Sequence, residues 1–263
     1  MTFAADTSLP CAIVPAANVE PRRGVGQPDM LVLHYTGMLS AAKAVDFLAR
    51  ADSRVSCHYV IDEAGRITQL VPETMRAWHA GQSAWHGETD LNSASVGIEI
   101  QNPGHDLGYH DFPDAQIAAV IALSRDIVER HRMPADRVVA HSDIAPERKI
   151  DPGEKFPWDR LFHGGVGHWV APSRLRLGER DLGPGDRGAG VAAAQALFVR
   201  YGYALGVDGI FGRRTECVVC AFQRHFRPAR CDGRLDLSTL ATLERLLAAR
   251  PGSGQGRAKR VRA

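Results

Sequence analysis

Residues 30–35, Met-Leu-Val-Leu-His-Tyr, form an apolar run that ends in a histidine and a tyrosine. Short continuous apolar runs of this kind are typical of strands buried on both faces of a sheet. A second run, Val-Val-Ala at residues 138–140, is also followed directly by a histidine, His141. The two runs therefore predict buried strands, each with an imidazole at or near its carboxyl end.

The segments around these runs alternate between helix and strand patterns. Apolar residues at helical spacing predict helices at residues 40–50 and 114–131, and strict alternation predicts a strand at residues 95–101. Residues 57–61 and 66–71 predict two further strands joined by a turn. Strands alternating with helices predict an α/β fold with a mixed central β-sheet flanked by helices.

The composition changes after this region. Glycine and proline become frequent, which predicts a linker over residues 166–184 between a first domain at residues 1–165 and a small second domain at residues 185–250. We expect few contacts to cross this boundary. A basic, glycine-rich tail at residues 251–263 is expected to be disordered. Within the second domain, the pattern predicts a bundle of three short helices, at residues 191–201, 212–226 and 237–249.

Composition and charge narrow the class of protein. Hydrophobic residues make up 44% and charged residues 24%, as in a globular protein that needs no disulfide framework. The net charge is +2, but the tail alone contributes four basic residues, so the rest carries −2. This balance gives no reason to expect a nucleic-acid partner, and no apolar run is long enough for a membrane span.

The expected location is the cytoplasm. The first ten residues have neither the basic start nor the apolar core of a secretory signal, and the five cysteines are odd in number, as fits reduced thiols. A periplasmic or cell-envelope location is the alternative if the true N-terminus is missing.

Three residues are candidate metal ligands. His34 and His141 stand at the ends of the two apolar runs, and Asp151 follows ten residues after His141. Zinc hydrolases commonly combine two imidazoles with one anionic ligand and leave a fourth position for water. A sheet brings strand ends together, so the distance along the chain between His34 and His141 is no objection.

Two further residues are candidates for catalysis. Glu99 lies on the polar face of a strand whose other face is apolar, where a general base could reach a water molecule. Lys149 lies two residues before Asp151 and would point to the same side of an extended segment, where its ammonium could stabilise an oxyanion. The alternatives without a catalytic role are that Glu99 is a solvated strand residue and that Lys149 is a surface lysine.

The same residues stand in motifs that resemble the type 2 N-acetylmuramoyl-L-alanine amidase family, with AmiD and AmpD as the most similar branches. The motifs occur in the family's order between about residues 20 and 160: His34-Tyr35-Thr36, Ser56-Cys57-His58-Tyr59, Arg76-Ala77-Trp78-His79-Ala80-Gly81, Val96-Gly97-Ile98-Glu99-Ile100, and residues 141–153 with His141, Lys149 and Asp151.

This resemblance implies the fold of the peptidoglycan recognition proteins and one zinc ion on His34, His141 and Asp151. It implies hydrolysis of the amide between N-acetylmuramic acid and L-alanine in peptidoglycan or muropeptides, with Glu99 and Lys149 as catalytic residues. It also implies that His58, Trp78 and His79 lie near the substrate groove. Two alternatives are a recognition protein that binds without cutting and a zinc peptidase acting within the stem peptide.

Residues 180–248 resemble the type 1 peptidoglycan-binding domain. The motifs that carry the resemblance are Gly185-Asp186-x-Gly188, Gly202-Tyr203, Asp208-Gly209-x-Phe211-Gly212 and Phe222-Gln223. A competing motif, Cys217-x2-Cys220-x4-His225-x5-Cys231, approaches a zinc-knuckle spacing. Its first two cysteines fall inside a predicted helix, which argues against a second zinc site.

Overall fold

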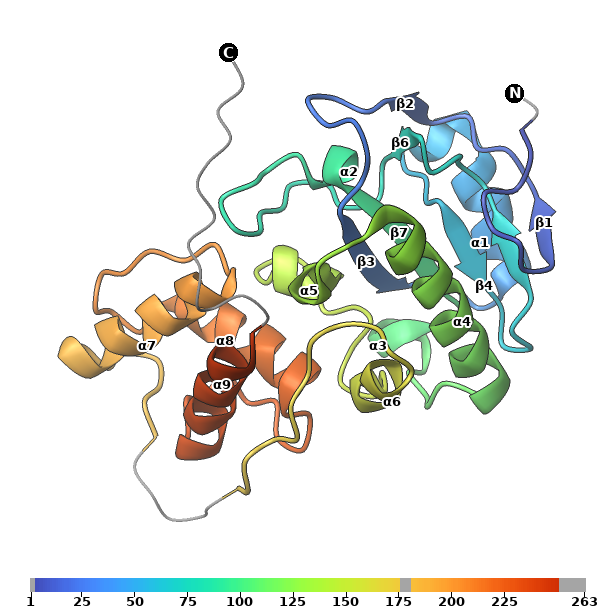
Figure 1. Ribbon diagram of the computed structural model, residues 1–263. Helices are drawn as coiled ribbons and strands as arrows, with labels where there is room; N and C mark the ends of the chain where they lie inside the picture. The colour runs from blue at the N-terminus through green and yellow to red at the C-terminus, as the bar shows by residue number, and fades with distance from the viewer. Residues whose placement is uncertain (1–2, 176–180, 251–263) are drawn as a thin grey trace.

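The computed structural model describes residues 3–175 and 181–250, so the predicted tail and part of the predicted linker lie outside the described residues. Figure 1 shows an α/β body and, beside it, a lobe made of the last three helices. The strands are β1 (Cys11–Ile13), β2 (Val19–Pro21), β3 (Met30–Tyr35), β4 (Tyr59–Ile61), β5 (Ile67–Gln69), β6 (Met75–Ala77), β7 (Ser95–Ile100) and β8 (Val138–Ala140). The α-helices are α1 (Ala41–Ala49), α2 (Leu91–Ala94), α3 (Gly104–Leu107), α4 (Asp114–His131), α5 (His141–Ile144), α6 (Trp158–His163), α7 (Ala189–Tyr201), α8 (Arg213–Phe226) and α9 (Leu237–Ala249).

The main sheet has six strands in the order β1-β5-β4-β7-β3-β8. β3 lies between β7 and β8 and runs parallel to both, whereas β4 and β5 are antiparallel. The pairing places Leu33 opposite Ala140 and His34 opposite Glu99. The predicted mixed central sheet flanked by helices is therefore confirmed.

Alternation along β3 divides its side chains between two cores. Leu31 and Leu33 pack with the apolar stripe of α4, in a core that also holds Ile98. Met30 and Val32 pack on the opposite face, in a core shared with the C-terminal helices. His34 has the same parity as Met30 and Val32, so its side chain leaves the sheet on the face away from α4.

The three C-terminal helices form the predicted bundle, but they do not stand apart from the first domain. Trp85 is almost completely buried, with its ring 5.0 Å from that of Tyr203, measured between centroids. The carboxylate of Asp143, on α5, accepts hydrogen bonds of 2.6 Å from the hydroxyl of Tyr203 and from Nδ1 of His225. Our expectation of few contacts across the boundary is therefore wrong, because one hydrophobic core joins the two parts.

The segment predicted as a linker also contributes to packing. Val166 is buried in the core beneath the sheet, and Trp169 packs against that core and against the shared one. Farther along, Leu182 exchanges backbone hydrogen bonds with Leu235, which precedes α9. Glycine and proline indicate an irregular backbone, but the described residues on either side of 176–180 pack against the protein.

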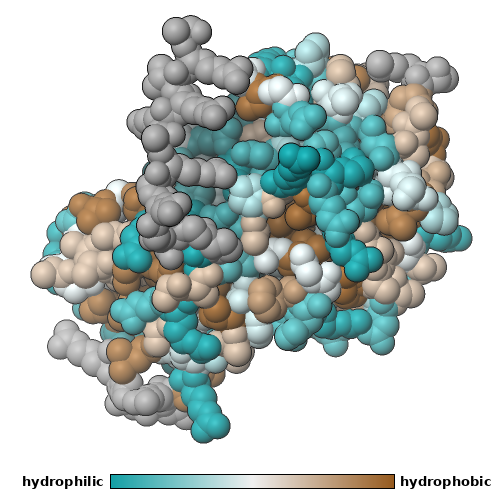
Figure 2. Space-filling model, viewed as in Figure 1, coloured by the Kyte–Doolittle hydropathy of each residue, from teal (hydrophilic) through white to brown (hydrophobic). Residues whose placement is uncertain are grey.

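Hydrophilic residues cover much of the upper part of the face in Figure 2, and hydrophobic ones are interspersed among them. None of the helices in the described ranges has the length and hydrophobicity that crossing a bilayer requires. The five cysteines are free thiols.

Candidate active site

Three ligand-type atoms converge at the carboxyl ends of β3 and β8. Nδ1 of His34 lies 2.8 Å from Nδ1 of His141 and 3.2 Å from Oδ2 of Asp151. Nδ1 of His141 lies 2.9 Å from the same carboxylate oxygen. Among residues 3–175 and 181–250, this is the one group of three or more His, Cys, Asp and Glu side chains that could hold a metal ion.

The topology explains why residues so distant in sequence meet. Because β3 and β8 are parallel neighbours with Leu33 opposite Ala140, His34 and His141 follow at the same level. His141 is the first residue of α5, and the chain returns after α5 so that the carbonyl of Asp151 accepts a hydrogen bond from the backbone N–H of Ser142. Two sheet neighbours and one returning loop thus supply the three side chains.

The charge states of this group suit a cation. Burial lowers the pKa of His34 to about 4, so its imidazole is neutral near pH 7. Burial raises the pKa of Asp151, but His141 and His34 more than offset this and hold that pKa well below its usual value. Two imidazoles and a carboxylate whose donor atoms converge are the donor set of a three-ligand metal site.

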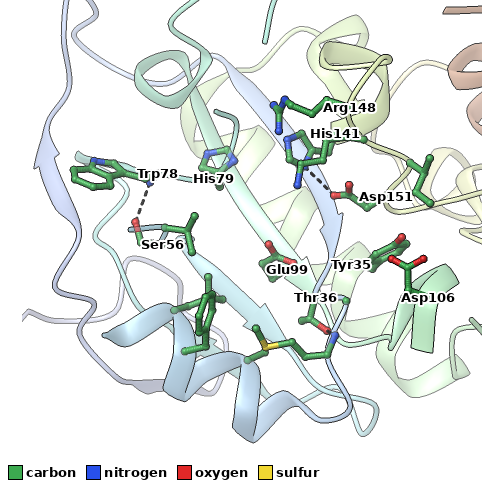
Figure 3. A pocket seen from close by; sticks show the side chains of 18 residues that line it. Tyr35, Thr36, Ser56, Trp78, His79, Glu99, Asp106, His141, Arg148 and Asp151 are labelled. Carbon is green, nitrogen blue, oxygen red and sulfur yellow. Dashed lines mark hydrogen bonds and ion pairs between the residues drawn. The ribbon is translucent and has the colours of Figure 1, made fainter. Parts of the chain in front are cut away.

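Glu99 lies beside this group, opposite His34 in the sheet. Figure 3 shows its side chain pointing into the same cavity as His141 and Asp151. Its Oε2 is buried without a hydrogen-bond partner, and burial, followed by the charge of Asp151, raises the pKa of its carboxyl well above the usual range. A carboxylate with a free lone pair and a raised pKa is suited to accept a proton.

The cavity above these residues has a volume of about 480 Å³, a size suited to a small substrate. Lys149 and Trp78 line it, as predicted for residues at the site. Tyr35 and Arg148 line it as well, although neither was predicted as a site residue. Tyr35 follows His34 and Arg148 precedes Lys149 in the sequence, and these neighbours were the features from which their place at the site could have been predicted.

The three predicted substrate contacts differ in their access to the cavity. His58 is fully buried, with Nδ1 accepting from the backbone N–H of Gly97, and it does not line the cavity. His79 lines the cavity, but it is 8% exposed and both of its ring nitrogens have partners, at His34 and Ser95. Trp78 also lines the cavity and is the more exposed of the two.

The residues of the competing zinc-knuckle motif are used differently. His225 bonds to Asp143 and stacks on Trp158, with ring centroids 3.6 Å apart. Cys217 and Cys220 lie on α8, as predicted from the helical pattern.

Two family models match this chain. The model of N-acetylmuramoyl-L-alanine amidase matches residues 24–154, and that of a peptidoglycan binding domain matches residues 187–243. The first match contains His34, Glu99 and His141 together with Lys149 and Asp151.

Among curated proteins, the N-acetylmuramoyl-L-alanine amidase AmiD of Escherichia coli is 40% identical over 237 residues, which are 83% of this chain and 82% of AmiD. The 1,6-anhydro-N-acetylmuramyl-L-alanine amidase AmpD of Citrobacter freundii is 35% identical, over 56% of this chain and 86% of AmpD.

Solved structures of amidases also resemble this chain. AmiD from Escherichia coli in complex with its substrate, anhydro-N-acetylmuramic acid-L-Ala-D-γ-Glu-L-Lys, matches with a TM-score of 0.72 and 38% identity, covering 89% of this chain and 91% of that chain. AmpDh3 from Pseudomonas aeruginosa in complex with anhydromuramic pentapeptide matches with a TM-score of 0.69 and 32% identity, covering 84% and 92%.

Proposed function

This chain belongs to the N-acetylmuramoyl-L-alanine amidase family, and we propose that it uses a zinc ion to hydrolyse the amide between N-acetylmuramic acid and L-alanine in peptidoglycan or its muropeptide fragments. The observation that carries the proposal is the convergence of the His34, His141 and Asp151 donor atoms next to a cavity of substrate size, which His141 and Asp151 line. A role in cell-wall turnover and recycling follows from these substrates.

The donor set fits zinc. His34, His141 and Asp151 would hold the ion, and two imidazoles with one carboxylate leave room for a fourth ligand, as in catalytic zinc sites. When bound, zinc supplies a Lewis acid that polarises a carbonyl oxygen and makes a water molecule more acidic.

We assign proton transfer to Glu99. Glu99 lines the cavity and its Oε2 has no hydrogen-bond partner, so the carboxylate can take a proton from the attacking water and then deliver that proton to the leaving amine of L-alanine. Lys149 lines the same cavity, and its ammonium is placed to stabilise the negative charge that develops on the carbonyl oxygen as water adds.

Trp78 is the side chain we assign to substrate binding. It lies at one side of the cavity in Figure 3, and its indole Nε1 is buried without a partner. Because Trp78 lines the cavity, its indole ring can pack against a bound ligand. His58 and His79, which the resemblance also implied, have their polar atoms engaged elsewhere.

We further propose that residues 1–165 are the catalytic domain, that residues 166–184 are a connecting segment, and that residues 185–250 hold the peptidoglycan polymer. The match to a peptidoglycan binding domain at residues 187–243 supports this division. Binding the polymer would raise the local concentration of cleavable bonds. We place the protein in a reducing compartment such as the cytoplasm, because its five cysteines are unpaired.

The metal assignment is tested by measuring zinc in the purified protein. We expect one zinc ion per chain, loss of activity on chelation and its return on adding zinc. His34→Ala and His141→Ala should each lose the metal, since two remaining protein ligands hold zinc poorly. Full activity in metal-free protein would contradict the assignment.

A further inference from the structure

A chain of buried hydrogen bonds runs from Leu91, the first residue of α2, to the predicted metal site. The Ser95 hydroxyl lies 2.5 Å from the carbonyl oxygen of Leu91. Nε2 of His79 lies 3.2 Å from the Ser95 hydroxyl, and Nδ1 of His79 lies 3.0 Å from Nε2 of His34. Ser95, His79 and His34 are all buried.

The direction of each bond in this chain follows from the carbonyl at its far end. The carbonyl of Leu91 can only accept, so the hydroxyl of Ser95 donates its single proton there. The Ser95 oxygen then accepts from Nε2–H of His79. A neutral imidazole with a proton on Nε2 has a lone pair on Nδ1, so His79 accepts from Nε2–H of His34. Nδ1 of His34 is thereby left with its lone pair facing His141 and Asp151.

We infer that Ser95 and His79 are positioning residues that fix the tautomer and ring orientation of His34, so that its Nδ1 is ready for a metal ion. The inference rests on the proposed metal site. Partners that hold the second nitrogen of a ligand histidine commonly strengthen metal binding in this way. His79 therefore acts through His34 and does not need to touch the substrate.

The segment that carries His79 serves the second imidazole as well. The carbonyl of Ala80 lies 3.3 Å from Nε2 of His141, so that nitrogen carries the proton and Nδ1 of His141 also faces the metal position. The consecutive residues His79 and Ala80 thus orient the imidazoles of His34 and His141, respectively.

This segment is held from three sides. Oδ1 of Asn92 accepts from the backbone N–H groups of His79 and Ala80, at 2.9 and 2.7 Å. The guanidinium of Arg148 donates to the carbonyl of Ala80 at 3.0 Å. Gly97 lies against the His79 ring, and a Cβ at Gly97 would come within 2.6 Å of it. The ring therefore has little freedom to turn away from His34.

The test compares the zinc affinity of the full-length protein and its variants by competition with a chromophoric chelator. We expect His79→Leu to weaken zinc binding by about 10–100-fold, because it removes the acceptor for His34. His79→Asn should recover part of the loss, since its amide oxygen can accept near the position of Nδ1. Ser95→Ala should weaken binding less than His79→Leu.

Ser124→Ala is the matched control for Ser95→Ala, because the Ser124 hydroxyl is equally buried but has no partner and lies on α4, away from the site. Its zinc affinity should equal that of the unmodified protein. Histidine ¹⁵N spectra of the metal-free protein give a second readout, and they should show the His34 proton on Nε2.

A folded His79→Leu protein that binds zinc as tightly as the unmodified protein would overturn the inference. So would a His34 proton on Nδ1 in the metal-free spectra, a result that does not depend on whether the His79→Leu variant folds. If the unmodified protein takes up no zinc, the metal site itself is wrong. Tight binding by His79→Leu would instead overturn the positioning role alone.

Discussion

Among single residues, Glu99 has the most specific role in the proposed reaction, as the general base. In Glu99→Gln the amide cannot accept a proton from water, whereas the three metal-binding side chains are untouched. We expect turnover of a muropeptide to fall by about 10²–10⁴, the usual range for a lost general base, while zinc content stays the same. Steady-state kinetics together with metal analysis would measure both effects.

Glu129→Gln is the matched control for this substitution. The substitution is chemically the same, but Glu129 is exposed on α4 and lies away from the cavity. Its turnover should stay at the level of the unmodified protein. If Glu99→Gln also keeps that level, another group is the base.

Residue types at strand ends were sufficient to predict that His34 and His141 meet, because parallel neighbouring strands end at the same edge of the sheet. Asp151 joins them from the loop that returns after α5. The positions of His58 and His79 could not be predicted in the same way. Whether a histidine faces a cavity or a hydrogen-bond partner depends on contacts such as those with Gly97 and Ser95, which no local pattern encodes.

At the scale of secondary-structure elements, Glu73 connects the region between β5 and β6 to the end of α4. Its buried carboxylate accepts hydrogen bonds from Tyr59, Arg130 and His131. Burial raises its pKa, but these bonds outweigh burial and lower the pKa to about 2, below the usual 4.5. The ionised carboxylate therefore stabilises the fold by an amount on the order of 3 kcal/mol.

We expect Glu73→Gln to lower the free energy of unfolding by about 2–3 kcal/mol near pH 7. A lowered pKa means that the contribution is complete above about pH 4.5 and disappears as the pH falls toward 2. The difference between the two proteins should shrink over that range. Urea unfolding at a series of pH values measures it.

Asp126→Asn separates this effect from the loss of any partner of Arg130. Asp126 pairs with the same arginine on the more exposed surface of α4. Such a pair contributes about 0–1 kcal/mol, so this variant should be nearly as stable as the unmodified protein. A Glu73→Gln protein no less stable than Asp126→Asn would contradict the assigned role.

The elements in which apolar residues recur at a regular spacing were predictable. The apolar stripe at residues 114–131 gave the bounds of α4, Asp114–His131, and Ser40 caps α1 as expected. The small antiparallel pair of β2 and β6 was not anticipated, nor were α2 and α3. Segments of three or four residues are too short to show a period, and tertiary contacts decide their structure.

At the scale of the whole molecule, the core shared by the two parts predicts one cooperative unfolding transition. A chain ending at residue 175 would remove the cover of Trp85, whose loss of packing alone should cost about 3–5 kcal/mol. For a chain of this size, that corresponds to a fall of about 6–20 °C in melting temperature. Differential scanning calorimetry of both chains measures the number of transitions and the shift.

Single substitutions in the C-terminal part provide a finer test. Tyr203→Phe removes the hydroxyl bonded to Asp143 and should cost about 1–3 kcal/mol. Val199→Ala, at an exposed position of α7, should be nearly neutral. Two separate transitions, or an unchanged melting temperature after truncation, would show that the two parts fold independently. Sequence could not reveal this packing, because the pattern of a buried helix face does not say which partner buries it.

Cleavage of the bond between N-acetylmuramic acid and L-alanine can be observed by mass spectrometry of the products formed from anhydro-N-acetylmuramic acid-L-Ala-D-γ-Glu-L-Lys. We predict two products, the free tripeptide and the anhydro-sugar with its lactyl carboxylate, formed only by the zinc-loaded protein. Cleavage inside the tripeptide would identify a peptidase, and an intact substrate after prolonged incubation with zinc-loaded protein would identify a binding protein. Either result would contradict the account.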